Sequence, residues 1–215
     1  MIKFSAKDNN ANCILLIGAH CDDIEIGCGG TVQRLLDIFP NAKFYWLVLS
    51  SNKIRKKEAM DSANYFLSRI KNRFIDIQDF KNGYFPYIGY EIKEYFDKLK
   101  NMIHPDIIFT HYGKDLHQDH RITSELTWNT FRDNFILEYE ILKYDGGLNT
   151  PNAFFEIGEN YMNVKIDGLL RYFQSEANKH WFTESSFKGL MRLRGVECNS
   201  SSGFAEAFYC RKICF

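Results

Sequence analysis

Residues 12–31 read NCILLIGAHCDDIEIGCGGT, and this stretch decides the fold. The apolar run that ends at Gly18 is typical of a buried parallel strand. Polar residues and three glycines follow, and Val32, Leu35 and Leu36 then return at helical spacing. A strand that leads through a glycine-rich turn into a helix is a typical opening unit of an α/β sheet.

The alternation of strand and helix continues along the chain. Apolar runs predict strands at 44–50, 74–77, 106–110 and 136–144. Helical spacing predicts helices at 56–70, 90–103 and 120–131. Parallel strands joined by right-handed crossovers account for this order. We therefore predict an α/β protein with a Rossmann-like three-layer fold and a mostly parallel central sheet.

The pattern loosens after residue 145. It predicts a hairpin at 154–157 and 161–166, a helix through Leu169 and Phe173, a helix at 182–194, and a final edge strand at 205–215. Because no linker interrupts the chain, we interpret residues 1–215 as a single domain. Its core spans about 12–145, and a C-terminal elaboration spans about 146–215.

Composition excludes several classes of protein. The 27 basic and 27 acidic residues give a formal net charge of zero, which argues against nucleic-acid binding. The polar start at 1–10 lacks the apolar core of a signal peptide, and no apolar run is long enough to cross a bilayer. We therefore expect a cytoplasmic protein without membrane insertion. The six cysteines contain no Cys-x-x-Cys pair, so neither a disulfide framework nor a zinc ribbon is expected.

Two short clusters follow predicted strands, at residues 20–23 (HCDD) and 117–120 (HQDH). In open parallel sheets, sites gather at the carboxyl ends of strands, so the two clusters are expected to meet. Two histidines and one carboxylate from separate loops leave Zn²⁺ an open position for water, and a further carboxylate can take a proton. Helix capping is the alternative for Asp22 or Asp23, but it accounts for one aspartate and not for both beside His20.

Other residues near the clusters have simpler interpretations. The glycines at 27–30 match neither a Rossmann fingerprint nor a P-loop, so they indicate close packing of the helix start. Lys114 and Asp115 are interpreted as loop charges in solvent. His111 lies at a strand end, where it could line the cleft. A protonated His117 could stabilise an oxyanion or donate a proton to a leaving amine.

Three segments together resemble the PIG-L/LmbE-like family of zinc-dependent N-deacetylases. The family has an Ala-His-Pro-Asp-Asp-x-Glu box, then Gly-x-Gly-Gly-Thr, and later a His-x-Asp-His box. Here they read AHCDDIE at 19–25, GCGGT at 27–31 and HQDH at 117–120. Arg194-Gly195 and the FAEAF segment at 204–208 also resemble members that act on sugars.

The resemblance implies a metal site with three ligands: His20, Asp23 and His120. The implied metal is Zn²⁺. Two histidines and one carboxylate also suit Fe²⁺ and, less tightly, Mn²⁺ or Co²⁺.

The resemblance also assigns roles to the neighbours of these ligands. Asp22 would be the general base, and His117 would be the electrostatic acid, oriented by Asp119. Glu25 would support the ligands from behind or favour the helix start by its charge. Cys21 replaces the family's proline, so this turn lacks that residue's stiffness.

The implied reaction is removal of an acetyl group from an N-acetylated amino sugar. The sugar could belong to glycan, sugar-nucleotide, thiol or natural-product biosynthesis. Arg192 and Arg194 are candidate contacts for a phosphate or nucleotide, and a plain helix-face role is an equal alternative. Two other interpretations stay open: hydrolysis of another small amide, and a non-catalytic sugar-binding protein. The aromatic residues of the last third favour a homo-oligomer.

Overall fold

The computed structural model describes residues 11–213. Within them, seven strands form one sheet in the order β3-β2-β1-β4-β5-β7-β6. The strands are β1 Cys13–Gly18, β2 Lys43–Val48, β3 Arg73–Ile77, β4 Ile107–His111, β5 Phe135–Tyr139, β6 Ala153–Glu156 and β7 Ala205–Cys210. The main helices are α1 Asp23–Ile38, α2 Lys53–Phe66, α3 Gly89–Met102, α4 Gln118–Thr130, α5 Glu159–Tyr172 and α6 Glu184–Glu197. Two short 3₁₀ helices are η2 Phe85–Tyr87 and η3 Gln174–Glu176.

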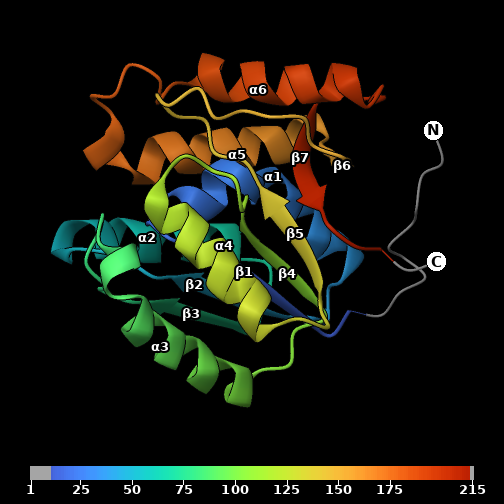
Figure 1. Cartoon of the computed structure of the whole chain (residues 1–215). Coiled ribbons are helices and arrows are strands. Elements are labelled where there is room, and N and C mark those ends of the chain that lie inside the picture. The colour runs from blue at the N-terminus through green and yellow to red at the C-terminus, as the bar shows by residue number, and fades with distance from the viewer. Residues whose placement is uncertain (1–10, 214–215) are drawn as a thin grey trace.

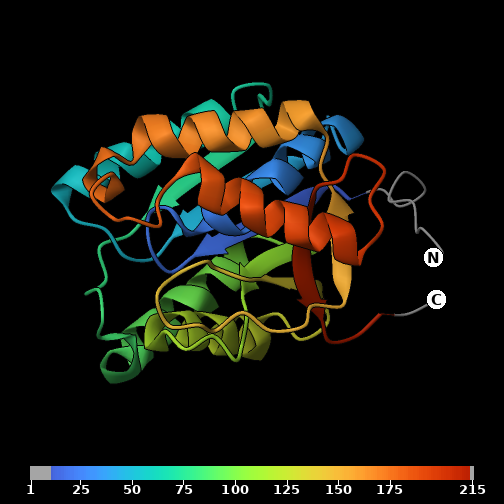
Figure 2. The same cartoon turned by 90° about the horizontal axis from the view of Figure 1, so that it is seen from above.

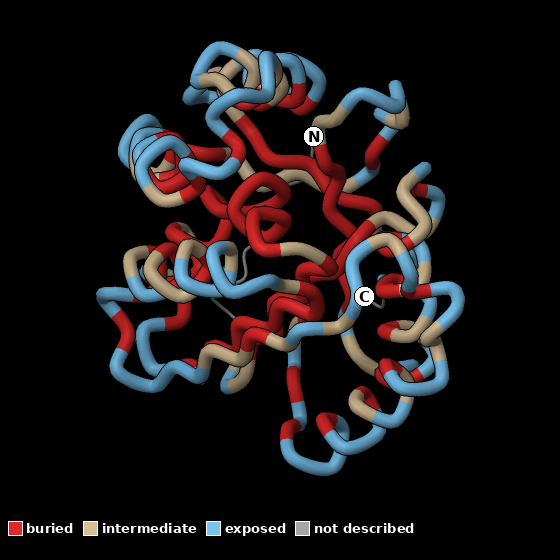
Figure 3. Tube along the Cα trace, turned by 90° about the vertical axis from the view of Figure 1, so that its left-hand side faces the viewer, coloured by how far each residue is buried: buried red, intermediate tan, exposed pale blue. Residues whose placement is uncertain are grey.

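The sheet lies between two layers of helices (Figures 1 and 2). Helices α1, α2, α5 and α6 cover one face, and α3 and α4 cover the other. Alternate residues of β1 serve the two cores: Ile14 and Leu16 join the first, and Leu15 and Ile17 join the second. This alternation explains the continuous apolar run, because a strand covered on both faces has no side left for water. Figure 3 shows the buried strands running between the exposed outer faces of the helices.

The predicted three-layer α/β fold is confirmed. Strands β3, β2, β1, β4 and β5 are parallel to their neighbours, and β7 is antiparallel to both β5 and β6. Among the described helices, none is long and apolar enough to cross a membrane. The expectation that concerned residues 1–10 lies outside the described residues, as does the last part of the final predicted strand.

The predicted hairpin after residue 145 is wrong. Residues 161–166 belong to helix α5, where Met162, Ile166 and Leu169 are buried at helical spacing against the first core. The segment reads YMNVKI, and so short a mixture of apolar and polar residues fits a strand or a helix until its partners are known. Strand β6 pairs with β7 instead.

Two element ends and one strand position also differ from the prediction. Strand β5 ends at Tyr139, well before residue 144. Helix α6 passes through Gly195 to Glu197. There the glycine is needed for packing: a Cβ on Gly195 would lie 2.2 Å from the carbonyl oxygen of Gly203. Finally, β7 is an interior strand and β6 occupies the edge.

Candidate metal centre

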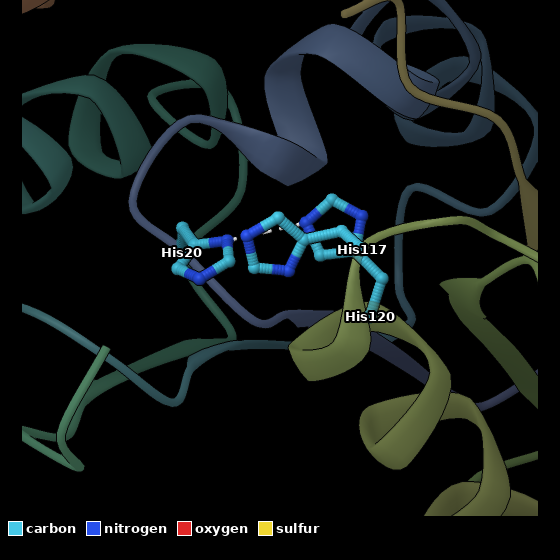
Figure 4. Close-up of side chains that lie close together, drawn as sticks. All are labelled: His20, His117 and His120. Atoms are coloured by element: carbon cyan, nitrogen blue, oxygen red, sulfur yellow. Dashed lines mark hydrogen bonds between the residues drawn. The ribbon is translucent and has the colours of Figure 1, made fainter. Parts of the chain in front are cut away.

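The two histidine clusters meet at one edge of the sheet. Strands β1 and β4 are parallel neighbours, so the turns that follow them lie side by side. His20 lies on the turn after β1, and Asp23 is the first residue of α1. His117 precedes α4, and His120 lies in its first turn. Figure 4 shows the three imidazoles close together at this junction.

The separations between the predicted ligand atoms fit a small metal ion. His20 Nδ1 lies 3.2 Å from His120 Nε2 and 3.3 Å from Asp23 Oδ2. His120 Nε2 lies 3.5 Å from Asp23 Oδ1. Ligands of tetrahedral zinc, each about 2.0–2.1 Å from the ion, lie about 3.3–3.4 Å from one another. The three side chains therefore lie at separations compatible with a ligand set, with one oxygen of Asp23 near each histidine.

His111 and His117 are also close enough to be considered as ligands. Each belongs to a metal-compatible group that includes His120 and has all ligand atoms within 4.8 Å. His111 Nε2, however, accepts a hydrogen bond from the backbone N–H of Ala19 at 2.9 Å. That bond uses the lone pair a metal would need. The ring of His111 stacks on the ring of His120 with 3.9 Å between their centroids, so His111 packs against the ligand set.

The ionisable side chains of the site shift one another's pKa values. Burial alone would raise the pKa of Asp23, but His120, His111 and His20 around it hold the pKa well below its usual range. Burial alone would lower the pKa of His20, but Asp23 and Asp119 raise it to about 10. Burial and the neighbouring His111 lower the pKa of His120 to about 3. Asp23 is thus an anion at neutral pH, as a metal ligand must be.

Asp22 has its charged partner outside the histidine cluster, although His20 and Asp23 both influence its pKa. It occupies the N-cap position of α1, yet its side chain makes no capping hydrogen bond, which contradicts the capping alternative. Its Oδ1 instead lies 2.9 Å from a terminal nitrogen of Arg55, in the first turn of α2. Burial raises the pKa of Asp22, and Arg55 opposes that rise. Sequence reasoning missed Arg55, because a lone arginine on a polar helix gives no local signal.

Asp115 is not a loop charge in solvent. It is 4% exposed, and its Oδ2 lies 3.1 Å from His120 Nδ1 and 2.7 Å from Lys143 Nζ. Its other oxygen accepts from the backbone N–H of His117. A metal-bound histidine commonly donates the N–H of its second ring nitrogen to a carboxylate in this way. The missed signal was its place in DLHQDH, because a carboxylate before a tight turn can fold back onto both histidines.

Asp119 contacts His117 through its backbone and not through its carboxylate. The Asp119 carboxylate lies 3.2 Å from His20 Nε2 and accepts from the backbone N–H groups of Gly83 and Phe85. His117 Nδ1 accepts instead from the backbone N–H of Asp119. Asp119 therefore orients His20, since the first turn of α4 points its carboxylate across to the β1 turn.

Comparison with known proteins shows the family of this chain. A family model described as PIG-L, GlcNAc-PI de-N-acetylase, matches residues 15–131, more than half of the chain. The chain belongs to the PIG-L family.

Solved structures share the fold at low sequence identity. The conserved protein TT1542 from Thermus thermophilus superposes with a TM-score of 0.75 at 17% identity, over 95% of this chain and 97% of that one. N,N′-diacetylchitobiose deacetylase from Pyrococcus horikoshii gives 0.67 at 20%, over 96% and 86%. GalB, the 4-carboxy-2-hydroxymuconate hydratase from Pseudomonas putida, gives 0.70 at 13%, over 95% and 98%.

The remaining residues of the first PIG-L box are buried behind the site. Glu25 is fully buried, and its Oε1 accepts from Ser62 Oγ of α2. Burial raises the pKa of Glu25 well above its usual value, which favours the neutral carboxyl over a charge at the helix start. Cys21 is 1% exposed, and burial raises the pKa of its thiol to about 12.

The glycine segment of the PIG-L family packs against the sheet, as predicted. A Cβ on Gly27 would lie 2.2 Å from the ring of Tyr139. The backbone N–H groups of Gly30 and Thr31 donate to Glu206, so a protein carboxylate occupies the place where a phosphate would bind.

The two predicted substrate arginines lie on α6. Arg194 is buried and donates to Glu140, Glu197 and the Asn149 carbonyl, so its donors are already used. These contacts contradict a substrate role for Arg194. Arg192 donates to the Gly203 carbonyl and stays a predicted contact.

Proposed function

We propose that this PIG-L protein is a zinc-dependent hydrolase that removes the acetyl group from an N-acetylated amino sugar. The observation that carries the proposal is the meeting of His20, Asp23 and His120 at mutual separations of 3.2–3.5 Å. A second carboxylate, Asp22, directly precedes Asp23 and forms an ion pair with Arg55. Family membership supports the same assignment.

In this proposal His20, Asp23 and His120 hold the metal. When bound, a divalent metal activates water and polarises the carbonyl of an amide. Zn²⁺ suits two imidazoles and a carboxylate, and Fe²⁺ accepts the same set. Asp115 fixes the ring of His120 by its contact with Nδ1, which leaves Nε2 directed at the other two ligands.

Asp22 acts as the general base. A base is most effective when its pKa approaches the working pH, and burial shifts Asp22 in that direction. Asp22 accepts the proton of the attacking water and then returns it to the departing amine. Attack by water and departure of the amine both need proton transfer, because an amide is a weak electrophile with a poor leaving group.

His117 stabilises the oxygen on which negative charge develops. Its Nδ1 accepts from the Asp119 backbone, so the neutral ring carries its proton on Nε2. Burial and the nearby His20 lower the pKa of His117. We therefore replace the expectation of a protonated His117 with a neutral ring whose Nε2–H donates to the developing oxyanion.

An acetylated sugar is the favoured substrate class. One fold neighbour deacetylates N,N′-diacetylchitobiose by its name. On this chain, Tyr84 offers a 45% exposed ring between Gly83 and Phe85, whose N–H groups bind Asp119 beside His20. Such a ring can stack on a sugar face at the mouth of the site. The fold by itself does not fix the reaction, since another neighbour is a hydratase.

The test is amine release from a panel of N-acetylglucosamine derivatives: free, phosphorylated, nucleotide-linked and glycosidic. Each is assayed with and without Zn²⁺, and Asp22→Asn is the matched control. We expect metal-dependent release from one class and a loss of about 10²–10⁴-fold in the variant. Release that persists undiminished in Asp22→Asn would refute the assignment of the base. No release from any member, with one metal bound per chain, would redirect the reaction to other small amides.

A further inference from the structure

Arg55 lies between two carboxylates that come from opposite ends of the chain. One terminal nitrogen lies 2.9 Å from Asp22 Oδ1, and the other donates to Glu176 Oε1 at 2.6 Å. Glu176 belongs to η3, which follows α5 in the C-terminal part. The side chain of Glu176 is 5% exposed and that of Arg55 is 21% exposed. A buried ion pair of this kind is costly unless its geometry is well fixed.

Asp22 and Asp23 have different charged or polar partners, and Arg55 is the partner of Asp22. Asp22 and Asp23 are neighbours in sequence, and two close carboxylates repel each other. Ring nitrogens of His20, His111 and His120 lie 3.1–3.5 Å from the oxygens of Asp23. Asp22 receives its positive partner from α2 instead. The arginine thus gives the second carboxylate a positive partner of its own.

Glu176 is itself held in place from several sides. The residue before it, Ser175, donates from its backbone N–H and its hydroxyl to Glu58 of α2. Lys179 forms an ion pair with the second oxygen of Glu176. The corner that follows α5 is therefore tied to α2 within one turn of Arg55. Because Glu176 is fixed, the direction in which Arg55 presents its other nitrogen is fixed too.

We propose that Glu176 is a positioning residue that acts on Asp22 through Arg55. It sets the orientation of the guanidinium, and the guanidinium sets the orientation of the base. The inference rests on the proposed function, in which Asp22 takes the proton of water. A misplacement of about 1 Å in a catalytic group can cost roughly 10²-fold in rate. Loss of Glu176 should therefore lower kcat and leave KM nearly unchanged.

The experiment measures kcat, KM and bound zinc for Glu176→Ala, Glu176→Gln and Arg55→Lys. We expect kcat to fall about 10–100-fold in Glu176→Ala, with KM within about twofold and zinc content unchanged. Glu176→Gln keeps an acceptor oxygen and should recover part of the loss. The control is Asp167→Ala, which breaks an exposed arginine–carboxylate pair on α5. It should leave kcat unchanged.

A double-mutant cycle separates positioning from general destabilisation. The ammonium of lysine cannot bridge two carboxylates as the forked guanidinium of arginine does. If Glu176 acts through Arg55, adding Glu176→Ala to Arg55→Lys should therefore lower kcat little further. Additive losses would overturn the proposal. A rise in KM at constant kcat would also overturn it, because Glu176 or Arg55 would then contact substrate.

A structural readout covers the case in which no acetylated sugar is hydrolysed. Crystal structures of the zinc-loaded native protein and of Glu176→Ala would be compared. The proposal expects the Arg55 guanidinium and the Asp22 carboxylate to change orientation in the variant. Unchanged positions would overturn the positioning role, whatever the substrate proves to be. Failure of the panel with a changed orientation would count against the proposed function alone.

Discussion

Residues 15–131 and residues 146–213 use buried charge in different ways. In the first region, Asp23 and His20 meet beyond the carboxyl ends of β1 and β4, and each belongs to a group of side chains that could hold a metal ion. In the second region, Lys165 pairs with Glu206, and Arg194 pairs with Glu140 from the end of β5, inside the fold. The first arrangement has ligand atoms left for a cation, and the second is complete. Buried charge therefore indicates a site only where the partners leave ligand atoms available.

The largest expected effect is a loss of metal binding when a ligand of the first region is removed. His120→Ala removes one of three proposed ligands, and we expect metal affinity to fall by more than about 100-fold, since loss of an outer partner alone costs about 10–100-fold. Metal analysis after dialysis and an amine-release assay would check this.

The matched control is His104→Ala, because this exposed histidine lies at the end of α3, away from the ligand set. It should retain full metal content. Unchanged metal binding in His120→Ala would remove His120 from the site and leave His117 as the candidate in its place.

A smaller effect is expected from breaking the second region. Glu206→Gln leaves the Lys165 ammonium without its carboxylate, and Glu206 also accepts from the Gly30 and Thr31 N–H groups. Breaking a buried pair on one side typically costs about 3–5 kcal/mol, so the free energy of unfolding in urea should fall by that order.

Metal content per folded chain should stay constant in Glu206→Gln, which sharpens the contrast between the regions. Glu184→Gln breaks an exposed pair on α6 and should change stability by less than about 0.5 kcal/mol. A loss of metal without a loss of stability in Glu206→Gln would contradict this division between the two regions.

The smallest effect concerns Glu25, whose burial raises its pKa well above the usual value. The folded state then holds a proton that the unfolded state releases, so the stability present below the unfolded pKa declines as pH rises toward the folded pKa. Glu25→Gln keeps an oxygen for Ser62 and removes this decline. We expect the variant to gain stability relative to the native protein as pH rises from about 5 to about 8, measured by urea unfolding. An equal pH dependence in both proteins would show that Glu25 is not a buried acid.

Sequence prediction succeeded where local pattern and burial agree. Strands β1 and β4 are apolar throughout most of their length because helices cover both faces, and each leads into a histidine cluster. It failed at 161–166, where six residues of mixed polarity fit a strand or a helix until their partner is known. It also misplaced Asp115, because loop position says little about whether a carboxylate turns inward to a histidine.

The sequence by itself determined the α/β class, the family and the two clusters whose carboxyl-end positions bring them together. These follow from periodicity and from residue types that few other sites require. Only the tertiary structure decided that Asp119 reaches His20, that Arg194 is already occupied, and that Glu176 meets Asp22 through Arg55. Those contacts join residues up to 121 positions apart. No local pattern encodes such a contact, since it depends on how separate helices pack across the sheet.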